Sequence, residues 1–318
     1  MDVWVLGRIG YDLYAVEHNR PLAEVEHFER DLGGSSANMA VGLSRLGLKV
    51  GIISAVGDDL LADYLIQRLQ AENVDTRFVR RVAGFNTSLC LTEVWPPNRF
   101  HQVFYRAKPA DSQIALTEDA VQAVRQSKMF VTNGTNFASQ PARTTAVQAL
   151  QAAHAGGATT VLDIDYRASS WTSPAEAGRA AAGVLSSVDV VLANEEELAL
   201  LTGTDDPDTQ IRSVLAAGPK LLVQKLGARG VAAHTMTGKH SAPSRTEKLV
   251  CAIGGGDGFA SGFLYALYRG YELPRALEYG NAAAAVVVGR VTCSSAMPRL
   301  SEVEALAQKE ISDRAVQT

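Results

Sequence analysis

Six short apolar segments, each separated from the next by helix-like stretches, constrain the fold of this chain more than any other feature. They are VWVLG (3–7), VGIIS (50–54), MFVTNG (129–134), TVLDID (160–165), VDVVLA (188–193) and LLVQKLG (221–227). Apolar spacing typical of helices, or an Ala-rich composition, marks the stretches 36–47, 59–72, 141–155, 174–186 and 194–202. Continuous apolar strands separated by helices are typical of a parallel sheet with both faces covered. We therefore expect an α/β fold with a three-layer α/β/α core.

Two segments, 12–33 and 86–107, interrupt this alternation. They are polar, rich in aromatic and β-branched residues, and partly alternating, as in TSLCLTEVW and FHQVFYR. This pattern indicates antiparallel strands with one face in solvent. We expect the two segments to form a small β-sheet lid over a core made of 1–11, 34–85 and 108–318, which we expect to be mainly helical from Gly254 to about Glu310.

Charge and cysteine content exclude several classes of protein. The formal net charge is −4, which argues against a general binder of nucleic acids or anionic membranes. Cys90, Cys251 and Cys293 are odd in number and lack CxxC spacing, so we expect no disulfide framework or zinc site. The start MDVWVLG does not resemble a signal peptide, and no long uncharged apolar run follows that could cross a membrane. We expect a cytoplasmic protein.

Ligands of open parallel sheets bind beyond the carboxyl ends of the strands. The residues that directly follow the predicted strands are therefore the candidates for a functional site. These are Asp12, residues 33–38, residues 133–136, residues 165–167, Asn194 and Gly227.

Three glycines before Asp257, in CAIGGGDGFASGFLYAL (251–267), lead into a predicted helix. Glycine allows main-chain amides to converge, and the first turn of a helix attracts anions. An ionised aspartate beside such amides can accept a hydroxyl proton while the amides stabilise a phosphate. The same residues would also suit an ordinary capped helix after a tight turn.

A second glycine pair precedes another predicted helix in DLGGSSANMAVGL (31–43). Ser35 and Asn38 lie one helical turn apart after Gly33 and Gly34, so their short polar side chains can hold sugar hydroxyls. A helix capped by serine is the alternative interpretation.

Taken together, these clusters resemble the signatures of the ribokinase-like (PfkB-type) carbohydrate kinases. GGSSAN and GGGDGFASGFL match the two signatures of that family in order, NEEE (194–197) matches its N-x-x-E motif, and VGDD (56–59) matches a frequent strand-end sequence. The resemblance covers essentially the whole chain. It implies a ribokinase-like core with a β-sheet lid and transfer of the γ-phosphoryl group of ATP to a sugar hydroxyl.

The resemblance also implies roles for individual residues. Asp257 would be the catalytic base, and the amides from Gly254 onward would form the anion hole. The remaining assignments are Gly255 and Gly256 for the anion hole; Asp12, Gly34, Ser35 and Asn38 for the sugar; Asn194, Lys225, Gly227, Gly230 and Asn281 for the nucleotide; and Glu197 for Mg²⁺, through water. An ordinary solvated helix turn is the alternative for Glu197. Cys251 and Ala252 replace an Asp-Thr pair that helps to hold a monovalent cation in many members, which leaves activation by K⁺ open.

Further stretches resemble the branch of the family that phosphorylates keto-deoxy sugar acids: GRIGYDLYAVEHNRPL, FYRAKPAD, LDIDYRASSW and CSSAMPRLSEVEAL. The implied acceptor is 5-dehydro-2-deoxy-D-gluconate of myo-inositol catabolism, whereas Val291 stands where that branch has a histidine. Arg106 and Arg167 would bind the carboxylate of the acid, and Tyr105 would stack on the acceptor or donate a hydrogen bond to it.

Several alternatives remain open. They are 2-dehydro-3-deoxygluconate as acceptor, a neutral sugar such as fructose or ribose, and a non-enzymatic sensor of a sugar acid or nucleotide. The predicted lid has a second face that another subunit could cover, so we expect a homodimer that forms through the lid.

Overall fold

The computed structural model describes residues 1–97, 99–246 and 248–316. Within these residues a nine-stranded sheet has the order β13-β12-β11-β10-β9-β8-β1-β4-β5 and is parallel except at β12 and β13. Its strands are β1 (Val3–Leu6), β4 (Val50–Gly57), β5 (Asp75–Val82), β8 (Met129–Asn133), β9 (Thr159–Asp163), β10 (Val190–Asn194), β11 (Leu221–Lys225), β12 (Val231–Thr235) and β13 (Gly238–Ala242).

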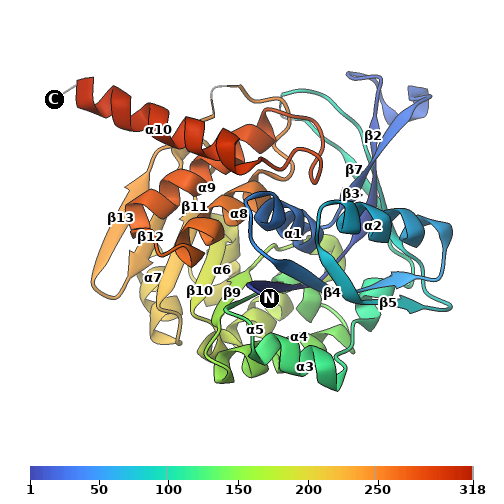
Figure 1. Cartoon of the computed structure of the whole chain (residues 1–318), viewed down its shortest axis with the longest axis horizontal. Helices are drawn as coiled ribbons and strands as arrows, with labels where there is room; N and C mark the ends of the chain where they lie inside the picture. Colours follow the sequence, from blue (N-terminus) through green and yellow to red (C-terminus); the bar gives the residue numbers. More distant parts are fainter. Residues whose placement is uncertain (98, 247, 317–318) are drawn as a thin grey trace.

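Helices cover both faces of this sheet (Figure 1). One face carries α1 (Ser35–Arg45), α2 (Leu60–Ala71), α8 (Gly255–Tyr268) and α9 (Leu273–Val288), and α10 (Leu300–Val316) packs on α9. The other face carries α3 (Glu118–Arg125), α4 (Ala142–Ala155), α5 (Pro174–Ala182), α6 (Glu195–Thr202) and α7 (Pro207–Ala216). The predicted three-layer core with a mainly parallel sheet is confirmed.

The first strand shows why the sheet lies between two cores. Val3 and Val5 belong to the apolar cluster under α1 and α8, whereas Trp4 and Leu6 belong to the cluster under α3 to α7. All four side chains are buried, because successive residues of a strand point to opposite faces. Each such side chain contributes about 1.5–3 kcal/mol through burial.

The predicted core strands and helices agree with the structure within a few residues, but the sheet is wider than the prediction. Strand β5, DTRFVRRV, is an edge strand with several exposed positions. Because charged residues occupy these positions, its sequence contains no continuous apolar run. The hairpin of β12 and β13, at the opposite edge, and the helices α3 and α7 were also not predicted.

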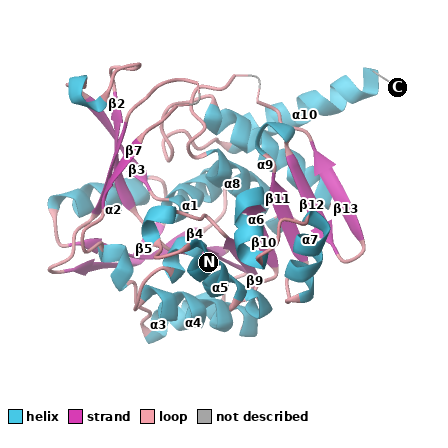
Figure 2. Ribbon diagram, turned by 180° about the vertical axis from the view of Figure 1, so that it is seen from behind, coloured by secondary structure: helices cyan, strands magenta, loops and turns pink. Residues whose placement is uncertain are grey.

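A separate four-stranded sheet, which we call the lid, stands at one end of the core (Figures 1 and 2). Its order is β3-β2-β6-β7, with the bounds β2 (Gly10–Ala15), β3 (Phe28–Gly33), β6 (Ser88–Thr92) and β7 (Gln102–Tyr105). The expectation of a wholly antiparallel lid was wrong, since β2 and β6 pair in parallel. Both strands follow short links from the carboxyl ends of the parallel core strands β1 and β5, so they run in the same direction.

The lid packs on the turn that precedes α8. Tyr14 and Ala15 of β2 form a small apolar cluster with Val94 and Cys293, and Ile253 packs against this cluster. The cluster therefore joins the lid to the segment that carries the glycines before Asp257. Among the described residues, no helix is both long and apolar enough to cross a bilayer.

Candidate active site

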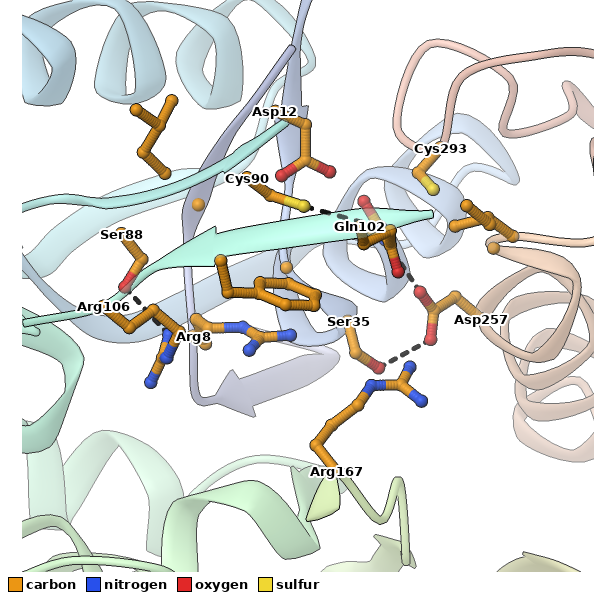
Figure 3. A pocket seen from close by; sticks show the side chains of 17 residues that line it. Arg8, Asp12, Ser35, Ser88, Cys90, Gln102, Arg106, Arg167, Asp257 and Cys293 are labelled. Atoms are coloured by element: carbon orange, nitrogen blue, oxygen red, sulfur yellow. Dashed lines mark hydrogen bonds between the residues drawn. The ribbon is translucent and has the colours of Figure 1, made fainter. Parts of the chain in front are cut away.

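A cavity lies where the lid meets the carboxyl ends of the core strands, and Asp257 lines it (Figure 3). The side chain of Asp257 projects from the first turn of α8. Its Oδ1 accepts a hydrogen bond of 2.6 Å from the Ser35 hydroxyl, and its Oδ2 accepts one of 2.7 Å from the Asn38 amide. The two predicted glycine-led helices, α1 and α8, thus meet at this carboxylate.

Neighbouring groups fix the direction of both hydrogen bonds. The Asn133 amide donates to the Ser35 hydroxyl at 2.8 Å, so the serine proton is directed to Asp257. The Ser294 hydroxyl donates to the side-chain oxygen (Oδ1) of Asn38 at 2.7 Å, so the side-chain NH₂ group of Asn38 faces the carboxylate of Asp257. These contacts hold Asp257 in one orientation.

Burial raises the pKa of Asp257 above its ordinary value, and the negative charge of Asp165 raises it further. The hydrogen bonds from Ser35 and Asn38 and the charge of Arg167 lower the pKa. A carboxylate with a raised pKa is a stronger base, so its surroundings favour proton acceptance.

The glycines before Asp257 have distinct local roles. Gly254 has a φ of +80°, a conformation that favours glycine. A Cβ at Gly255 would lie 2.7 Å from Val288, whereas a Cβ at Gly256 would meet only the Lys225 ammonium, at 3.9 Å. The main chain at Gly256 is therefore open toward Lys225, and the first turn of α8 offers amides for an anion.

The acceptor side of the cavity contains the predicted residues Asp12, Gly34, Ser35 and Asn38. Asp12 projects from β2 and is 9% exposed. Its burial raises the pKa of this carboxyl to about 7, and the nearby Arg8 is the strongest influence that lowers it. Gly34 has a φ of +93°, and a Cβ there would lie 2.5 Å from the carbonyl oxygen of Arg8. The start of α1 is thus packed directly on the turn between β1 and β2.

The structure also places Arg106 and Arg167 on the wall of this cavity, and each has a partner within the chain. Arg106 donates to the Ser88 hydroxyl at 2.8 Å and to both carboxylate oxygens of Asp111, at 3.1 and 2.7 Å. Arg167 lies 2.9 Å from a carboxylate oxygen of Asp165.

Tyr105 is not part of the cavity wall. It is 60% exposed, and Phe104 lines the cavity in its place. The pleat of β7 explains this correction, because Gln102 and Phe104 face the site while Val103 and Tyr105 face outward.

Arg8 lines the cavity and was not predicted. It follows the first apolar segment by one residue, at the sheet edge where ligands bind, and this position was the signal that could have identified it.

A second cavity, of about 560 Å³, lies on the other side of the glycine turn. It brings together four residues predicted for the nucleotide: Lys225, Gly227, Gly230 and Asn281. Its apolar wall was not predicted and includes Val231, Leu249, Phe259, Ala284 and Val288. Such a wall suits a flat aromatic base.

Asn194 and Glu197 do not line either cavity. They form a capping box at the start of α6, in which each side chain accepts a hydrogen bond from the other residue's main-chain amide, at 2.8 and 2.7 Å. The other oxygen of Glu197 accepts from the Tyr166 amide at 3.0 Å. Glu197 is buried, so the alternative of a solvated turn is wrong for this residue.

Lys225 links this capping box to the second cavity. Its ammonium lies 2.7 Å from Asp163 and 3.9 Å from Glu197. Burial disfavours its charged form, but these two carboxylates outweigh burial and raise the pKa of Lys225. Burial also raises the pKa of Asp163 to about 7, against the lowering effect of Lys225. In the part of the chain that the structure describes, no group of three or more Asp, Glu, His or Cys residues could hold a metal ion.

Comparison with known proteins identifies relatives over nearly the whole chain. A family model described as "pfkB family carbohydrate kinase" matches residues 1–300. A 5-dehydro-2-deoxygluconokinase of Halalkalibacterium halodurans is 35% identical over 314 residues, which are 97% of this chain and 95% of that protein. A 5-dehydro-2-deoxygluconokinase of Lacticaseibacillus casei is also 35% identical, over 97% of this chain and 96% of that protein.

Solved structures share the fold. A fructokinase of Xylella fastidiosa with bound ATP has a TM-score of 0.85 and 25% identity, covering 97% of this chain and 98% of that one. An Escherichia coli protein described as a ribokinase II, in complex with ATP and Mg²⁺, has a TM-score of 0.88 and 23% identity, covering 97% and 99%.

Proposed function

The chain belongs to the pfkB family of carbohydrate kinases and is a sugar kinase, and we propose that its acceptor is the sugar acid 5-dehydro-2-deoxy-D-gluconate. The observation that carries the proposal is the position of Asp257. This carboxylate lines a cavity that also contains three arginines, and its helix begins beside the second, larger cavity. An acceptor cavity with several arginines suits an acid, because a guanidinium can bind a carboxylate through two parallel hydrogen bonds.

In the proposed reaction, Asp257 is the general base. The acceptor hydroxyl replaces Ser35 or Asn38 as the hydrogen-bond donor to the carboxylate and gives its proton to it. The acceptor oxygen forms a bond to the γ-phosphorus while the bond from that phosphorus to the bridging oxygen of ADP breaks. Main-chain amides at Gly255 and Gly256 stabilise the charge on the transferred group.

The larger cavity would hold ATP. Its apolar wall, which includes Phe259 and Val288, supports a place for the base, and Gly227, where a Cβ would meet nothing within 4 Å, leaves room for the sugar and phosphates. A Cβ at Gly230 would lie 2.1 Å from the carbonyl oxygen of Ala242, so this glycine shapes the cavity wall. Lys225 lies between this cavity and the first turn of α8, so we assign its charge to the phosphates. Asn281 donates to the carbonyl oxygens of Ala242 and Pro243, at 3.3 and 2.8 Å, and we assign it to the positioning of the cavity wall.

Magnesium would be bound mainly by the phosphates of ATP and by water. Both oxygens of Glu197 already accept main-chain hydrogen bonds, which fits an outer position rather than direct coordination. Mg²⁺ commonly keeps several waters and bridges carboxylates and substrate phosphates. When bound, the ion would neutralise phosphate charge during transfer.

The acceptor cavity has only about 60 Å³ of free space, against 300–1,000 Å³ for typical ligand cavities. We therefore propose that the lid moves away from the core to admit the acceptor. The two links between β1 and β2 and between β5 and β6 are the segments in which this movement would occur.

An activity screen with a base variant tests the proposal. Purified enzyme is assayed for ADP release with ATP, Mg²⁺ and each of 5-dehydro-2-deoxy-D-gluconate, 2-dehydro-3-deoxygluconate, D-gluconate, D-fructose and D-ribose. The first acid should have the highest kcat/KM. Asp257→Asn should keep its circular-dichroism spectrum and its affinity for ATP but lose about 10²–10⁴ in kcat.

Asp205→Asn, at an exposed position outside the site, is the matched control and should behave as wild type. Full turnover by Asp257→Asn would refute the base assignment. A preference for fructose or ribose would refute the acid acceptor, and tight acid binding with no ADP formed would favour a sensor.

We further propose a cytoplasmic homodimer that forms through the outer face of the lid. Val103 and Tyr105 of β7 are 42% and 60% exposed on that face, which supports an apolar contact. The three free, buried cysteines support a reducing compartment. Light scattering should give the mass of a dimer, and Tyr105→Asp should reduce it to that of a monomer; a monomeric wild type would contradict the proposal.

A further inference from the structure

Three arginines line the acceptor cavity, and they differ in whether their donors are already used. The fork of Arg106 is occupied by Asp111 and Ser88, whereas Arg167 contacts Asp165 through one terminal nitrogen. Within residues 1–97, 99–246 and 248–316, the guanidinium of Arg8 has no hydrogen bond and no ion pair. It faces the ring of Phe104, whose centroid lies 5.9 Å away. Among the described arginines that line this cavity, Arg8 is therefore the one whose guanidinium has neither a hydrogen bond nor an ion pair within the chain.

The position of Arg8 is fixed by its backbone rather than by side-chain partners. Gly7 has a φ of +152°, and a Cβ there would lie 2.1 Å from the hydroxyl oxygen of Ser36. Gly34 brings α1 against the carbonyl oxygen of Arg8 from the other side. The turn that carries Arg8 is thus held between β1 and the start of α1. This packing fixes the main chain of Arg8, whereas no hydrogen bond or ion pair among the described residues fixes its guanidinium.

Charge near Arg8 is only partly balanced. Asp12 is the neighbouring acid, and Arg8 is the largest influence that opposes its raised pKa. The aromatic face of Phe104 attracts the guanidinium but supplies no hydrogen-bond acceptor. Figure 3 shows Arg8 between Arg106 and Ser35 among the side chains that line the cavity with Asp257.

From these observations we infer that Arg8 binds the carboxylate of the acceptor and determines its specificity for an acid. This inference rests on the proposed function, because it requires an acid acceptor. A free guanidinium offers a carboxylate two parallel hydrogen bonds without first breaking an ion pair within the chain. Arg106, in contrast, would have to leave Asp111, and Arg167 already shares its charge with Asp165. With the carboxylate at Arg8 and the reacting hydroxyl at Asp257, the acid lies along the cavity between β2 and α8.

The test compares 5-dehydro-2-deoxy-D-gluconate with its neutral carboxamide in wild type and in Arg8→Met, which keeps an unbranched apolar stem and removes the guanidinium. Wild type should strongly prefer the acid. Arg8→Met should raise the KM for the acid on the order of 10²-fold, change kcat and the KM for the carboxamide little, and so abolish the preference. Arg77→Met, on the exposed surface of β5, is the control and should match wild type.

Two further measurements separate recognition from a structural role. Methylguanidinium should restore acid turnover in Arg8→Ala, and Arg8→Lys should recover part of the acid preference. Calorimetry without ATP should show the same loss of acid affinity in Arg8→Met.

A KM for the acid within about threefold of wild type would overturn the inference and leave the kinase proposal intact. Equal losses for the acid and the carboxamide would also overturn it. If the wild type itself phosphorylates no acid, the proposed function fails first, whatever the Arg8 variants do.

Discussion

The buried carboxyl of Asp12 should impose a pH dependence on the stability of the folded chain. Its ordinary pKa of 3.8 is raised to about 7, primarily by burial, so the folded state retains a proton that the unfolded state has lost. Asp12 therefore stabilises the fold at low pH, and this contribution disappears as the pH rises through the folded-state pKa. The change Asp12→Asn replaces the carboxyl by a neutral group of similar shape and should remove this dependence.

The size of the effect follows from the two pKa values. A shift from 3.8 to about 7 corresponds to an upper limit of about 4 kcal/mol between very low and high pH. Between pH 5 and pH 8 the same relation gives about 3 kcal/mol. Relative to wild type, the stability of Asp12→Asn should rise by up to that amount over this interval and then stay constant.

Urea unfolding of both proteins at several pH values, followed by circular dichroism, measures the difference in free energy of unfolding. In the difference between the two proteins, the contributions of other titrating groups to the pH dependence cancel. These groups include Asp163, whose pKa is also raised to about 7. Parallel stability curves for the two proteins across pH 5–8 would refute the reasoning. They would mean that the pKa of Asp12 in the folded state stays near its ordinary value, because water or a nearby positive charge stabilises the carboxylate.

Three further predictions follow from the site. The kcat of the wild type should fall on acidification with an apparent pKa above the ordinary 3.8, because Asp257 must be ionised to accept a proton; a profile that is flat down to pH 4 would contradict this. Gly34→Ala should destabilise the fold more than Gly47→Ala does, since both have positive φ but only the first Cβ collides with main chain; equal urea midpoints would contradict this. Lys225→Met should destabilise the fold by about 3–5 kcal/mol at pH 8 and less at pH 6, where Asp163 can take up a proton; no pH dependence of the loss would contradict this.

The sequence predicted the parts of the fold in which a local pattern and the tertiary structure agree. Central strands such as β1 are buried on both faces and consist of continuous apolar residues, which distinguishes them from their surroundings. Edge strand β5 contains three arginines because its outer positions face solvent, so its pattern resembles that of a loop. Its strand conformation comes from pairing with β4, which no local pattern records.

The candidate site residues also divide into those that a local motif identifies and those that depend on tertiary contacts. Asp257, Ser35 and Asn38 were predicted because short motifs name them, and the structure joins them through hydrogen bonds. Tyr105 was assigned to the site because the register of β7 cannot be read from a motif. Arg8 was missed because its significance depends on Arg106 having a partner, Asp111, a contact known only from the structure.

The site is assembled from pieces of different origin. Acceptor-facing groups such as Asp12, Gln102 and Phe104 come from the lid, whereas Asp257 and its glycine turn come from the core. Changes confined to the two lid insertions can therefore alter which alcohol is phosphorylated without altering Asp257 or its glycine turn. Exchange of these insertions between distant relatives is therefore a direct way to change the substrate while the catalytic residues stay in place.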